Sequence, residues 1–449
     1  MHQILVWQKG LLVAKLDHKK DIEENIEKSG LDIENISEEV EHHVKHIAHL
    51  SFKKWILGIG LLILTLAGIV ISAGIGPVRV PPAMTARILI SRIPGLGGVW
   101  DNLKDKVSIE CNNLQERLSL IQNQTLSHNN GSQSGGKTVE IQEDIDAIRA
   151  KMRDLENYEI WIWQGRMPRI IVALLVGAGL SVSGVIFQGL VLNPLASSGT
   201  LGVSAGSAAG ASIFIVFGSG LSVFSFAWGI PLSALAGGLI TLGLVWFVAR
   251  SGRGTTSPLS LILAGVIVGI FLGSAMSFIR IVAEEESLRT LTLWGGGSLA
   301  SREWMHVKMA VPIIIAGILL AIINARDLNA LSLGAEQARN LGVNVNRSRQ
   351  ILMITAAVIT AGAVSVSGPI GFVGLVIPHS VRMLIGPDHR TLVPFSALGG
   401  GIFLLICDTV GRTLASPLEL PVGIVTPLIG APFFVYIYKT RMKSGAVIT

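Results

Sequence analysis

Charged residues are scarce in this sequence, and their scarcity excludes an ordinary water-soluble enzyme. Only 15% of the 449 residues are charged, 50% are hydrophobic, and the mean hydropathy of +0.59 lies above the range of soluble globular domains. The two cysteines, Cys111 and Cys407, lie far apart in different surroundings. We therefore expect neither a disulfide framework nor a cysteine-built metal site. The composition predicts a polytopic membrane protein.

The basic balance of the chain fits the same class. The formal charge is +6 and the pI about 9.4, but membrane proteins gather Lys and Arg in cytoplasmic loops for topological reasons. We expect a lipid bilayer, and no nucleic acid, as the partner of these charges. The first long apolar run, Trp55 to Gly76, has 22 residues. Its length predicts a full membrane span rather than the shorter apolar core of a secretory signal.

Long apolar runs predict ten transmembrane helices. Residues 170–249 contain no Asp, Glu, Lys or Arg, which allows three crossings at about 20 residues each. Further runs lie at 254–279, 309–325, 350–381 (broken by Ser367-Gly368-Pro369 and counted twice), 391–407 and 420–438. Because backbone amides in lipid need internal partners, we interpret these runs as helices. The predicted fold class is an all-α polytopic membrane protein.

The distribution of basic residues predicts the orientation. With both termini in the cytoplasm, 13 Lys and Arg residues flank the inner ends of the spans and 5 lie in the short outer loops. We expect a multi-pass protein of the cell membrane. The predicted regions are a cytoplasmic extension at 1–54, the first span at 55–76, an extracytoplasmic insertion at 77–165, a transmembrane core at 166–438 and a cytoplasmic tail at 439–449.

A short internal repeat predicts two inverted halves. The sequence SVSG at 181–184 recurs at 365–368, and FQGLV at 187–191 is echoed by FVGLV at 372–376. The copies begin five helices apart, so they would run in opposite directions through the membrane. A five-plus-five inverted repeat is typical of transporters, in which the substrate path lies between the halves.

The insertion at 77–165 is predicted to hold a helical hairpin. Apolar residues recur at steps of three and four between Leu103 and Ile121 and again between Ile141 and Leu155, on either side of a Gly- and Ser-rich stretch at 127–136. We expect two amphipathic helices joined by a flexible turn. Gly131–Thr138 matches the phosphate-loop pattern G-x-x-x-x-G-K-[ST]. No buried strand precedes it, and we interpret it as a chance match.

Few residues in the spans could carry chemistry. Asp408 and Arg412 stand one helical turn apart and are predicted to pair. His379 is expected to pack or cap, and His42, His43, His46 and His49 are expected to form a solvated helix face rather than a metal site. We predict no catalytic residue, resident metal or cofactor. The stretch Asp327–Gly342 reads as a short amphipathic helix bounded by glycines, against which a partner could push.

From Gln164 to Tyr438 the chain resembles the FecCD-type permeases, the membrane subunits of ATP-binding-cassette importers for iron chelates, haem and cobalamin. The matching blocks are RMPR at 166–169, LVGA at 175–178, NPLA at 193–196, LGVS at 201–204, LGAE at 333–336, GFVGLVIPH at 371–379 and ELPVG at 419–423. The resemblance implies a homodimer with two cytoplasmic ATPase subunits and an extracytoplasmic substrate-binding protein. ATP hydrolysis would reside in the partner, so the chain itself would not be an enzyme.

The resemblance also implies roles for individual residues. The coupling element that sits in a cleft of the ATPase would comprise Leu333, Gly334, Glu336, Ala338, Arg339, Leu341 and Gly342. The arginines that dock carboxylates of the binding protein would be Arg166, Arg169 and Arg412. The nearest candidates for an inner gate are Thr255, Thr256 and Ser257.

Three candidate functions of this chain follow. The first is the permease of an importer that moves an iron-siderophore, haem or cobalamin by alternating access. The second is an ion-coupled secondary transporter of a small polar solute, which an inverted repeat fits equally well. The third is a nucleotide-binding membrane enzyme built on Gly131–Thr138. Transport without ATPase subunits would favour the second, and loss of all function in Lys137→Ala would favour the third.

Overall fold

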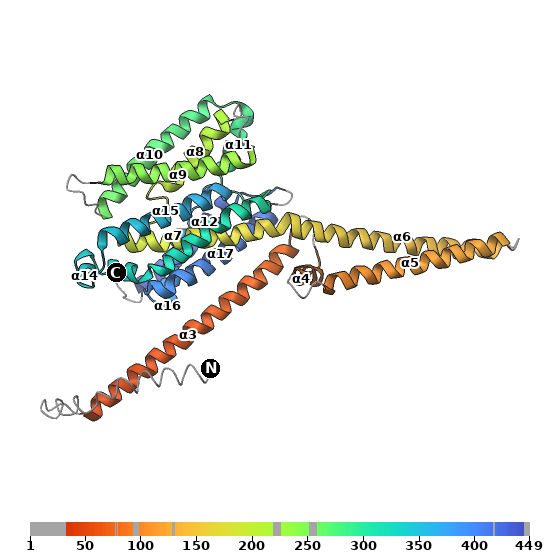
Figure 1. The fold of residues 1–449 in the computed structure, drawn as a ribbon, viewed down its shortest axis with the longest axis horizontal. Helices are drawn as coiled ribbons and strands as arrows, with labels where there is room; N and C mark the ends of the chain where they lie inside the picture. The colour runs from red at the N-terminus through yellow and green to blue at the C-terminus, as the bar shows by residue number, and fades with distance from the viewer. Residues whose placement is uncertain are drawn as a thin grey trace. The chain divides into compact units, whose positions relative to one another are not determined.

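The described part of the chain is built of helices. The computed structural model describes residues 33–76, 78, 80–92, 98–127, 131–218, 226–250, 258–415 and 418–443, and it contains no β-strand within them (Figure 1). The predicted all-helical class is therefore confirmed for these residues. The predicted gate residues Thr255, Thr256 and Ser257 lie outside the described residues.

The first described helix, α3 (Ile33–Gly74), passes without a break through the expected boundary at 54/55. It includes an apolar stretch, Lys54–Gly74, that is long enough to cross a membrane. The four histidines at 42–49 lie on α3, but their side chains are outside those that the structure describes. After α3 comes the short helix α4 (Pro82–Ser91).

The predicted helical hairpin is present. Helices α5 (Gly98–Ser127) and α6 (Gly131–Ile160) lie side by side (Figure 1). The apolar side chains of Val107 and Cys111 on α5 and of Ile145 and Leu155 on α6 are buried, as the spacing of the apolar positions requires.

The predicted flexible turn of the hairpin is wrong for residues 131–136, because these residues lie in the first turns of α6. Extending an existing helix costs far less than nucleating one, which outweighs the turn preference of Gly and Ser. The phosphate-loop match is therefore helical, and within the described residues no strand precedes it.

The hairpin is continuous with the membrane core. Helix α6 passes through one turn of π-helix, η1 (Trp161–Arg166), directly into α7 (Met167–Val191). The expected domain boundary at 165/166 thus falls inside continuous helix. A π-turn re-aims the side chains that follow it, and here it stands immediately before Met167, Pro168 and Arg169.

The helices that follow α7 form the core. They are α8 (Val203–Phe217), α9 (Phe226–Ala249), α10 (Pro258–Val282), α11 (Glu285–Gly295), α12 (Trp304–Ile323), α13 (Ala325–Ser332), α14 (Ala335–Asn340), α15 (Val345–Ser367), α16 (Val373–Ile385), α17 (His389–Leu414) and α18 (Val422–Lys443). Helices α7 and α15 are the most buried of the long apolar helices.

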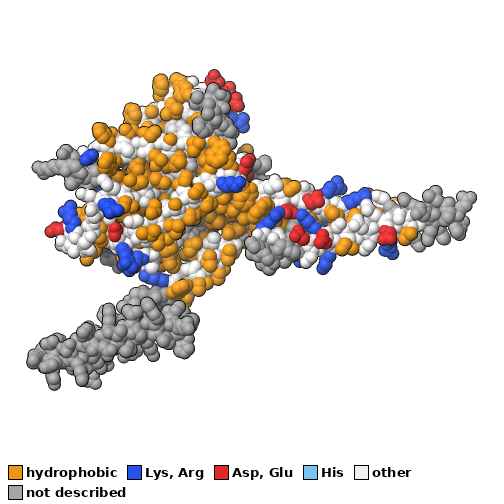
Figure 2. Space-filling view, viewed as in Figure 1, with side chains coloured by type: hydrophobic (Ala, Val, Ile, Leu, Met, Phe, Trp, Pro, Cys, Tyr) orange, Lys and Arg blue, Asp and Glu red, His pale blue; other side chains and the backbone are white. Residues whose placement is uncertain are grey.

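Seven of the described helices are long and apolar enough to cross a membrane. Shorter apolar helices are α8, α16 and the Val422–Tyr436 part of α18. The count of ten spans stays a prediction. The break predicted at 367–369 is confirmed, because α15 ends at Ser367 and α16 begins at Val373. The apolar side chains lie on the outside as well as in the core. Figure 2 shows them gathered over the helices from α7 to α17, whereas Lys, Arg, Asp and Glu follow the α5–α6 hairpin.

Glycines bring the core helices into close contact. A side chain at Gly177 of α7 would collide with the carbonyl of Gly400 on α17, and one at Gly184 with the carbonyl of Gly374 on α16. Gly184 and Gly374 belong to the two copies of the sequence repeat, so the two signatures pack against each other. Such backbone contact is how membrane helices associate without a hydrophobic driving force.

Candidate functional site

Four arginines gather at one end of α7 and α17, and we name them the arginine cluster: Arg166, Arg169, Arg302 and Arg412. Arg169 stands in the first turn of α7, directly after the π-turn that ends with Arg166. Arg412 stands in the last turn of α17. Because α7 and α17 pack side by side through Gly177 and Gly400, these helix ends meet.

Arg169 is held by two carboxylates from α17 and its C-terminal connection. Its Nε lies 3.0 Å from both carboxylate oxygens of Asp408, and its Nη2 lies 2.8 Å from Oδ1. Its Nη1 donates to Glu419 Oε2 at 2.7 Å. The side chain of Asp408 is only 1% exposed and that of Glu419 is 34% exposed. Arg169 thus joins a buried ion pair to one that solvent can reach.

The other two predicted docking arginines bind the C-terminal end of α3 and the residues just after it. Arg412 Nη2 donates to the hydroxyl of Ser72 at 2.6 Å and to its carbonyl at 3.1 Å, and Arg412 Nε lies 3.3 Å from Asp408 Oδ2. Arg166 donates to the carbonyls of Ala73 and Val78. The predicted pairing of Asp408 with Arg412 is confirmed. The cluster therefore fastens the end of α3 to α7 and α17.

The fourth member, Arg302, lies between α11 and α12 and has no carboxylate partner among the described residues. Its Nη2 donates to the carbonyl of Ser298 at 3.2 Å, and its Nη1 lies 3.4 Å from His306 Nε2. Burial, together with the positive charge of Arg169, lowers the pKa of Arg302 from its ordinary 12.5 to about 10. Among the described residues the four arginines are accompanied by two paired carboxylates, Asp408 and Glu419. The cluster therefore has a net positive charge.

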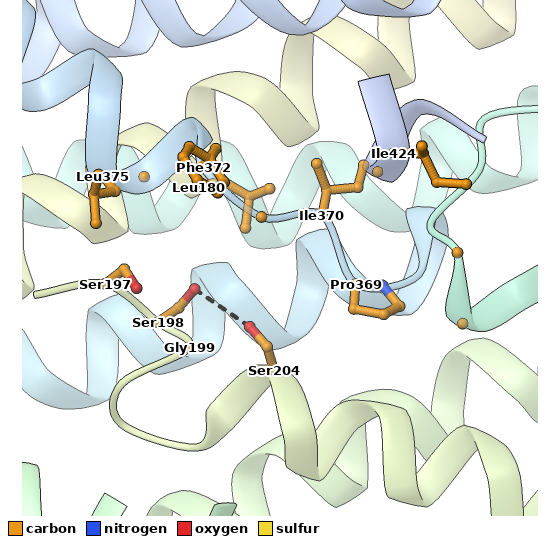
Figure 3. A pocket seen from close by; sticks show the side chains of 15 residues that line it. Leu180, Ser197, Ser198, Gly199, Ser204, Pro369, Ile370, Phe372, Leu375 and Ile424 are labelled. Carbon is orange, nitrogen blue, oxygen red and sulfur yellow. Dashed lines mark hydrogen bonds between the residues drawn. The ribbon is translucent and has the colours of Figure 1, made fainter. Parts of the chain in front are cut away.

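Near the middle of α7 a small cavity of about 350 Å³ is lined by Leu180, which directly precedes the first copy of the repeat, and by residues of the second copy (Figure 3). The hydroxyls of Ser198 and Ser204 form a hydrogen bond of 3.3 Å on one wall. Leu180, Phe372 and Leu375 form the opposite wall. The lining has no charged side chain, so the cavity offers hydroxyls and apolar surface but no fixed ligand for a bare metal ion.

Phe372 of that wall has a strained backbone. It lies immediately before α16, with φ +68° and ψ −34°, a region that a bulky residue seldom adopts. Such strain gathers at sites where the surrounding structure holds a functional geometry. The matching Phe187 of the first repeat copy lies inside the continuous helix α7 and is fully buried. Only in the second repeat copy is the helix interrupted, between Ser367 and Val373 beside the cavity.

The predicted coupling element is exposed, and we name Leu333–Gly342 the coupling segment. Leu333 is 61% and Leu341 64% exposed, and Glu336 and Arg339 also face outward. Ala338 is fully buried and anchors the short helix α14. One amphipathic helix was predicted over 327–342, but two are present, because Gly334 adopts φ +109° and separates α13 from α14. That conformation is open to glycine and strained for other residues.

The sequence shows the local features of these sites and misses the long-range ones. The structure brings Arg166, Arg169 and Arg412 together, and it places the coupling residues in one continuous exposed segment. The Arg169–Asp408 pair, the role of Arg302 and the cavity were not predicted. Glu419 lies in the ELPVG block, so its acidic side chain was visible in the sequence, but its partner was not. Within the described residues no group of His, Cys, Asp and Glu side chains could hold a metal ion.

Comparison with known proteins identifies the family. The model of the FecCD transport family matches residues 132–440, more than half of the chain. The chain belongs to the FecCD transport family. The match extends through the core helices and begins within α6 of the hairpin.

Two named permeases are similar to this chain in sequence. The hemin transport system permease protein HmuU of Yersinia pestis is 40% identical over 293 residues, which cover 64% of this chain and 87% of HmuU. The cobalamin import system permease protein BtuC of Halobacterium salinarum is 42% identical over 286 residues, 64% of this chain and 75% of BtuC. A solved structure described as an inward-facing metal-chelate type ABC transporter shares a TM-score of 0.63 and 30% identity, covering 86% of this chain and 99% of that one.

This FecCD protein is a multi-pass membrane permease of the ABC transporter class. The family consists of transport permease subunits, which are not themselves enzymes. The apolar helices of the described residues agree with that assignment. Its relatives are named for different cargoes, hemin and cobalamin among them, so membership of the family leaves the cargo of this chain open.

Proposed function

We propose that this chain is the membrane subunit of an ATP-driven importer that brings a metal chelate into the cytoplasm. The observation that carries the proposal is the coupling segment, which exposes Leu333 and Leu341 together with Glu336 and Arg339 while it is anchored by buried Ala338. An exposed apolar pair rimmed by charges is typical of a surface that a partner protein covers. In an ABC permease the partner that supplies energy is an ATPase, and we assign this surface to it.

The proposed assembly contains two copies of this chain, two cytoplasmic ATPase subunits and an extracytoplasmic binding protein. Both termini would lie in the cytoplasm, as the excess of Lys and Arg on that side favours. The cavity, about 350 Å³, lies at the lower end of the about 300–1,000 Å³ that ligand pockets commonly have. A large chelate would therefore need a wider passage, and we place it between the two copies of the chain.

Docking of the binding protein at Arg166, Arg169 and Arg412 remains a prediction, and the geometry refines it. These side chains are buried and already bound within the chain. The positive excess of the arginine cluster supports attraction of acidic side chains. We propose docking at Arg169, because a carboxylate of the binding protein could replace Glu419, whose side chain is 34% exposed.

Alternating access would open the cavity first to one side of the membrane and then to the other. The bent segment before α16 and the Gly184–Gly374 contact lie where the two repeat copies meet. We propose that these contacts shift as the coupling segment moves.

Uptake in proteoliposomes tests the proposed function. The chain, with its ATPase subunits, would be reconstituted and offered ferric citrate, a ferric hydroxamate, hemin and cyanocobalamin, each with its binding protein. We expect accumulation of one of these chelates that requires ATP and stops with vanadate. Uptake driven by a proton or sodium gradient without ATPase subunits would instead support the ion-coupled transporter.

A further inference from the structure

One asparagine links the helix before the coupling segment to the start of α17. Asn329 lies on α13, four positions before Leu333, and is half-buried. Its Oδ1 accepts hydrogen bonds from the backbone N–H of His389 at 2.8 Å and lies 2.7 Å from His389 Nδ1. Its Nδ2 donates to Asp388 Oδ1 at 2.7 Å. A single side chain thus makes three contacts with the first residues of another helix.

These contacts determine the state of the histidine ring. The backbone N–H of His389 and the carboxylate of Asp388 fix which atom of the Asn329 amide is oxygen, so His389 Nδ1 must be the donor. In the neutral ring His389 Nε2 then carries no proton, and within the described residues it has no hydrogen-bond partner. A side chain at Gly189 of α7 would meet this nitrogen and Leu328 of α13. Three helices therefore converge on the ring of His389.

The helix that Asn329 holds reaches both other sites. Asp388 caps α17 by accepting from the backbone N–H of Arg390 at 3.1 Å. Farther along α17, Gly400 packs on α7 and Asp408 binds Arg169. A displacement of the first turn of α17 would therefore act on the cavity wall that α7 provides and on the arginine cluster.

We propose that Asn329 is a positioning residue for energy coupling, which transmits movement of the coupling segment to α17. The proposal rests on the proposed function, because it assumes that an ATPase moves the segment. Helix α13 also receives a hydrogen bond in its first turn, from the hydroxyl of Ser348 on α15 to Asp327. Asn329 differs from Asp327 in that its side chain contacts two residues at the N-terminus of α17, Asp388 and His389. Coupling through such a contiguous network requires a direct measurement of coupling.

Charge-bearing variants separate transmission from folding. Asn329→Asp places a second carboxylate opposite Asp388 at hydrogen-bond distance, and the two like charges repel. Asp388→Asn alone keeps an oxygen for the cap to Arg390 and for the amide of Asn329. The double variant N329D/D388N removes the repulsion, because position 388 is then uncharged. Asn346→Asp makes the same chemical change at an exposed position of α15 and serves as the control.

The experiment uses the full complex with its ATPase subunits in nanodiscs. A bimane fluorophore is attached after Ser198→Cys in the cavity wall; the native Cys111 and Cys407 are buried. Affinity for the ATPase, ATP hydrolysis and the bimane response to ATP with vanadate are measured for each variant. We expect N329D to bind the ATPase within twofold of the parent and to keep hydrolysing ATP, but to lose at least fivefold in bimane response. D388N and N346D should respond within twofold, and N329D/D388N should recover at least half.

Three results would overturn the proposal: a bimane response of N329D within twofold of the parent, a parallel loss of ATPase affinity, or no recovery in the double variant. If N329D does not fold, Asn329→Ala removes the same contacts without a charge, and the same loss of response is expected. The proposed function fails separately, since the parent complex itself would then show no response to ATP.

Discussion

The family resemblance assigns two regions to partner proteins, three arginines of the arginine cluster and the coupling segment. The first region is buried in the fold and the second is exposed. Arg166, Arg169 and Arg412 are only 9%, 8% and 3% exposed, and each is bound within the chain. Leu333 and Leu341 are 61% and 64% exposed. One surface is engaged by its own chain, and the other is open.

The difference separates stability from docking. The cluster joins α3, α7 and α17, so its charges contribute to the fold before any partner arrives. The coupling segment is held by little beyond buried Ala338 and the two glycine turns, so its exposed face is available to a partner. Substitutions in the cluster should therefore act on stability first, and those in the segment on ATPase binding first.

The largest effect is expected for Arg169→Ala. The variant leaves the buried carboxylate of Asp408 with Arg412 alone, and removing one partner of a buried ion pair costs about 3–5 kcal/mol. Unfolding of the purified chain in detergent measures the loss. Glu336→Gln in the coupling segment is the matched control, with an expected change below about 0.5 kcal/mol. If the two variants had the same free energy of unfolding, the arginine cluster would contribute no more to stability than the coupling segment does.

A smaller effect, on binding alone, is expected for Leu333→Ala combined with Leu341→Ala. Each truncation removes apolar area that the ATPase would cover, worth about 1 kcal/mol, so together they should weaken ATPase binding about 30-fold. Surface plasmon resonance with the ATPase subunit measures the affinity. The unfolding midpoint should stay unchanged, because both side chains are exposed in the isolated chain. Unaltered ATPase affinity would show that the partner binds elsewhere.

Glu419→Gln tests whether the cluster can exchange partners. Removing this half-exposed carboxylate frees Arg169 Nη1 from its ion pair while Asp408 keeps the rest of the guanidinium. A surface pair of this kind is worth about 1 kcal/mol or less, so the affinity of the binding protein should rise by up to about fivefold. The gain should shrink at high salt. A fall in affinity would indicate that Glu419 itself contacts the binding protein.

The smallest effect concerns the arginine without a carboxylate. Because the pKa of Arg302 is lowered to about 10 in the folded chain, the folded state binds this proton less tightly than the unfolded state does. The charge therefore costs stability at neutral pH, and the cost is relieved as pH rises above 10.

Arg302→Gln should accordingly raise the free energy of unfolding slightly at pH 7, by at most about 1 kcal/mol. The difference from the parent should narrow at pH 10.5. Thermal unfolding of the two chains at both pH values provides the comparison. A loss of stability at pH 7 would mean that the contacts of Arg302 with Ser298 and His306 outweigh its burial.

The sequence predicted what neighbours along the chain determine. Apolar runs located the helices, Ser367-Gly368-Pro369 marked the break between α15 and α16, and the i, i+4 spacing of Asp408 and Arg412 predicted their ion pair. The stretch Asp327–Gly342 was recognised as helical, although Gly334 divides it into two helices. Each of these features is written within a few residues.

Contacts between distant residues escaped prediction. Arg169 and Asp408 are 239 positions apart, and Asn329 and His389 are 60 apart. Nothing in a single sequence pairs one buried arginine with one carboxylate among many, because the pairing depends on how α7 and α17 pack. Resemblance supplied the arginines as a set but not their intrachain partners.

The proposed function requires that the coupling segment faces the cytoplasm and binds the ATPase there. Glu336→Cys, in a chain whose native cysteines are buried, would be treated with a membrane-impermeant maleimide in sealed vesicles of either orientation. We expect labelling in inside-out vesicles alone and protection when the ATPase subunits are bound. Labelling from the outer side, or labelling that bound ATPase does not diminish, would contradict the account.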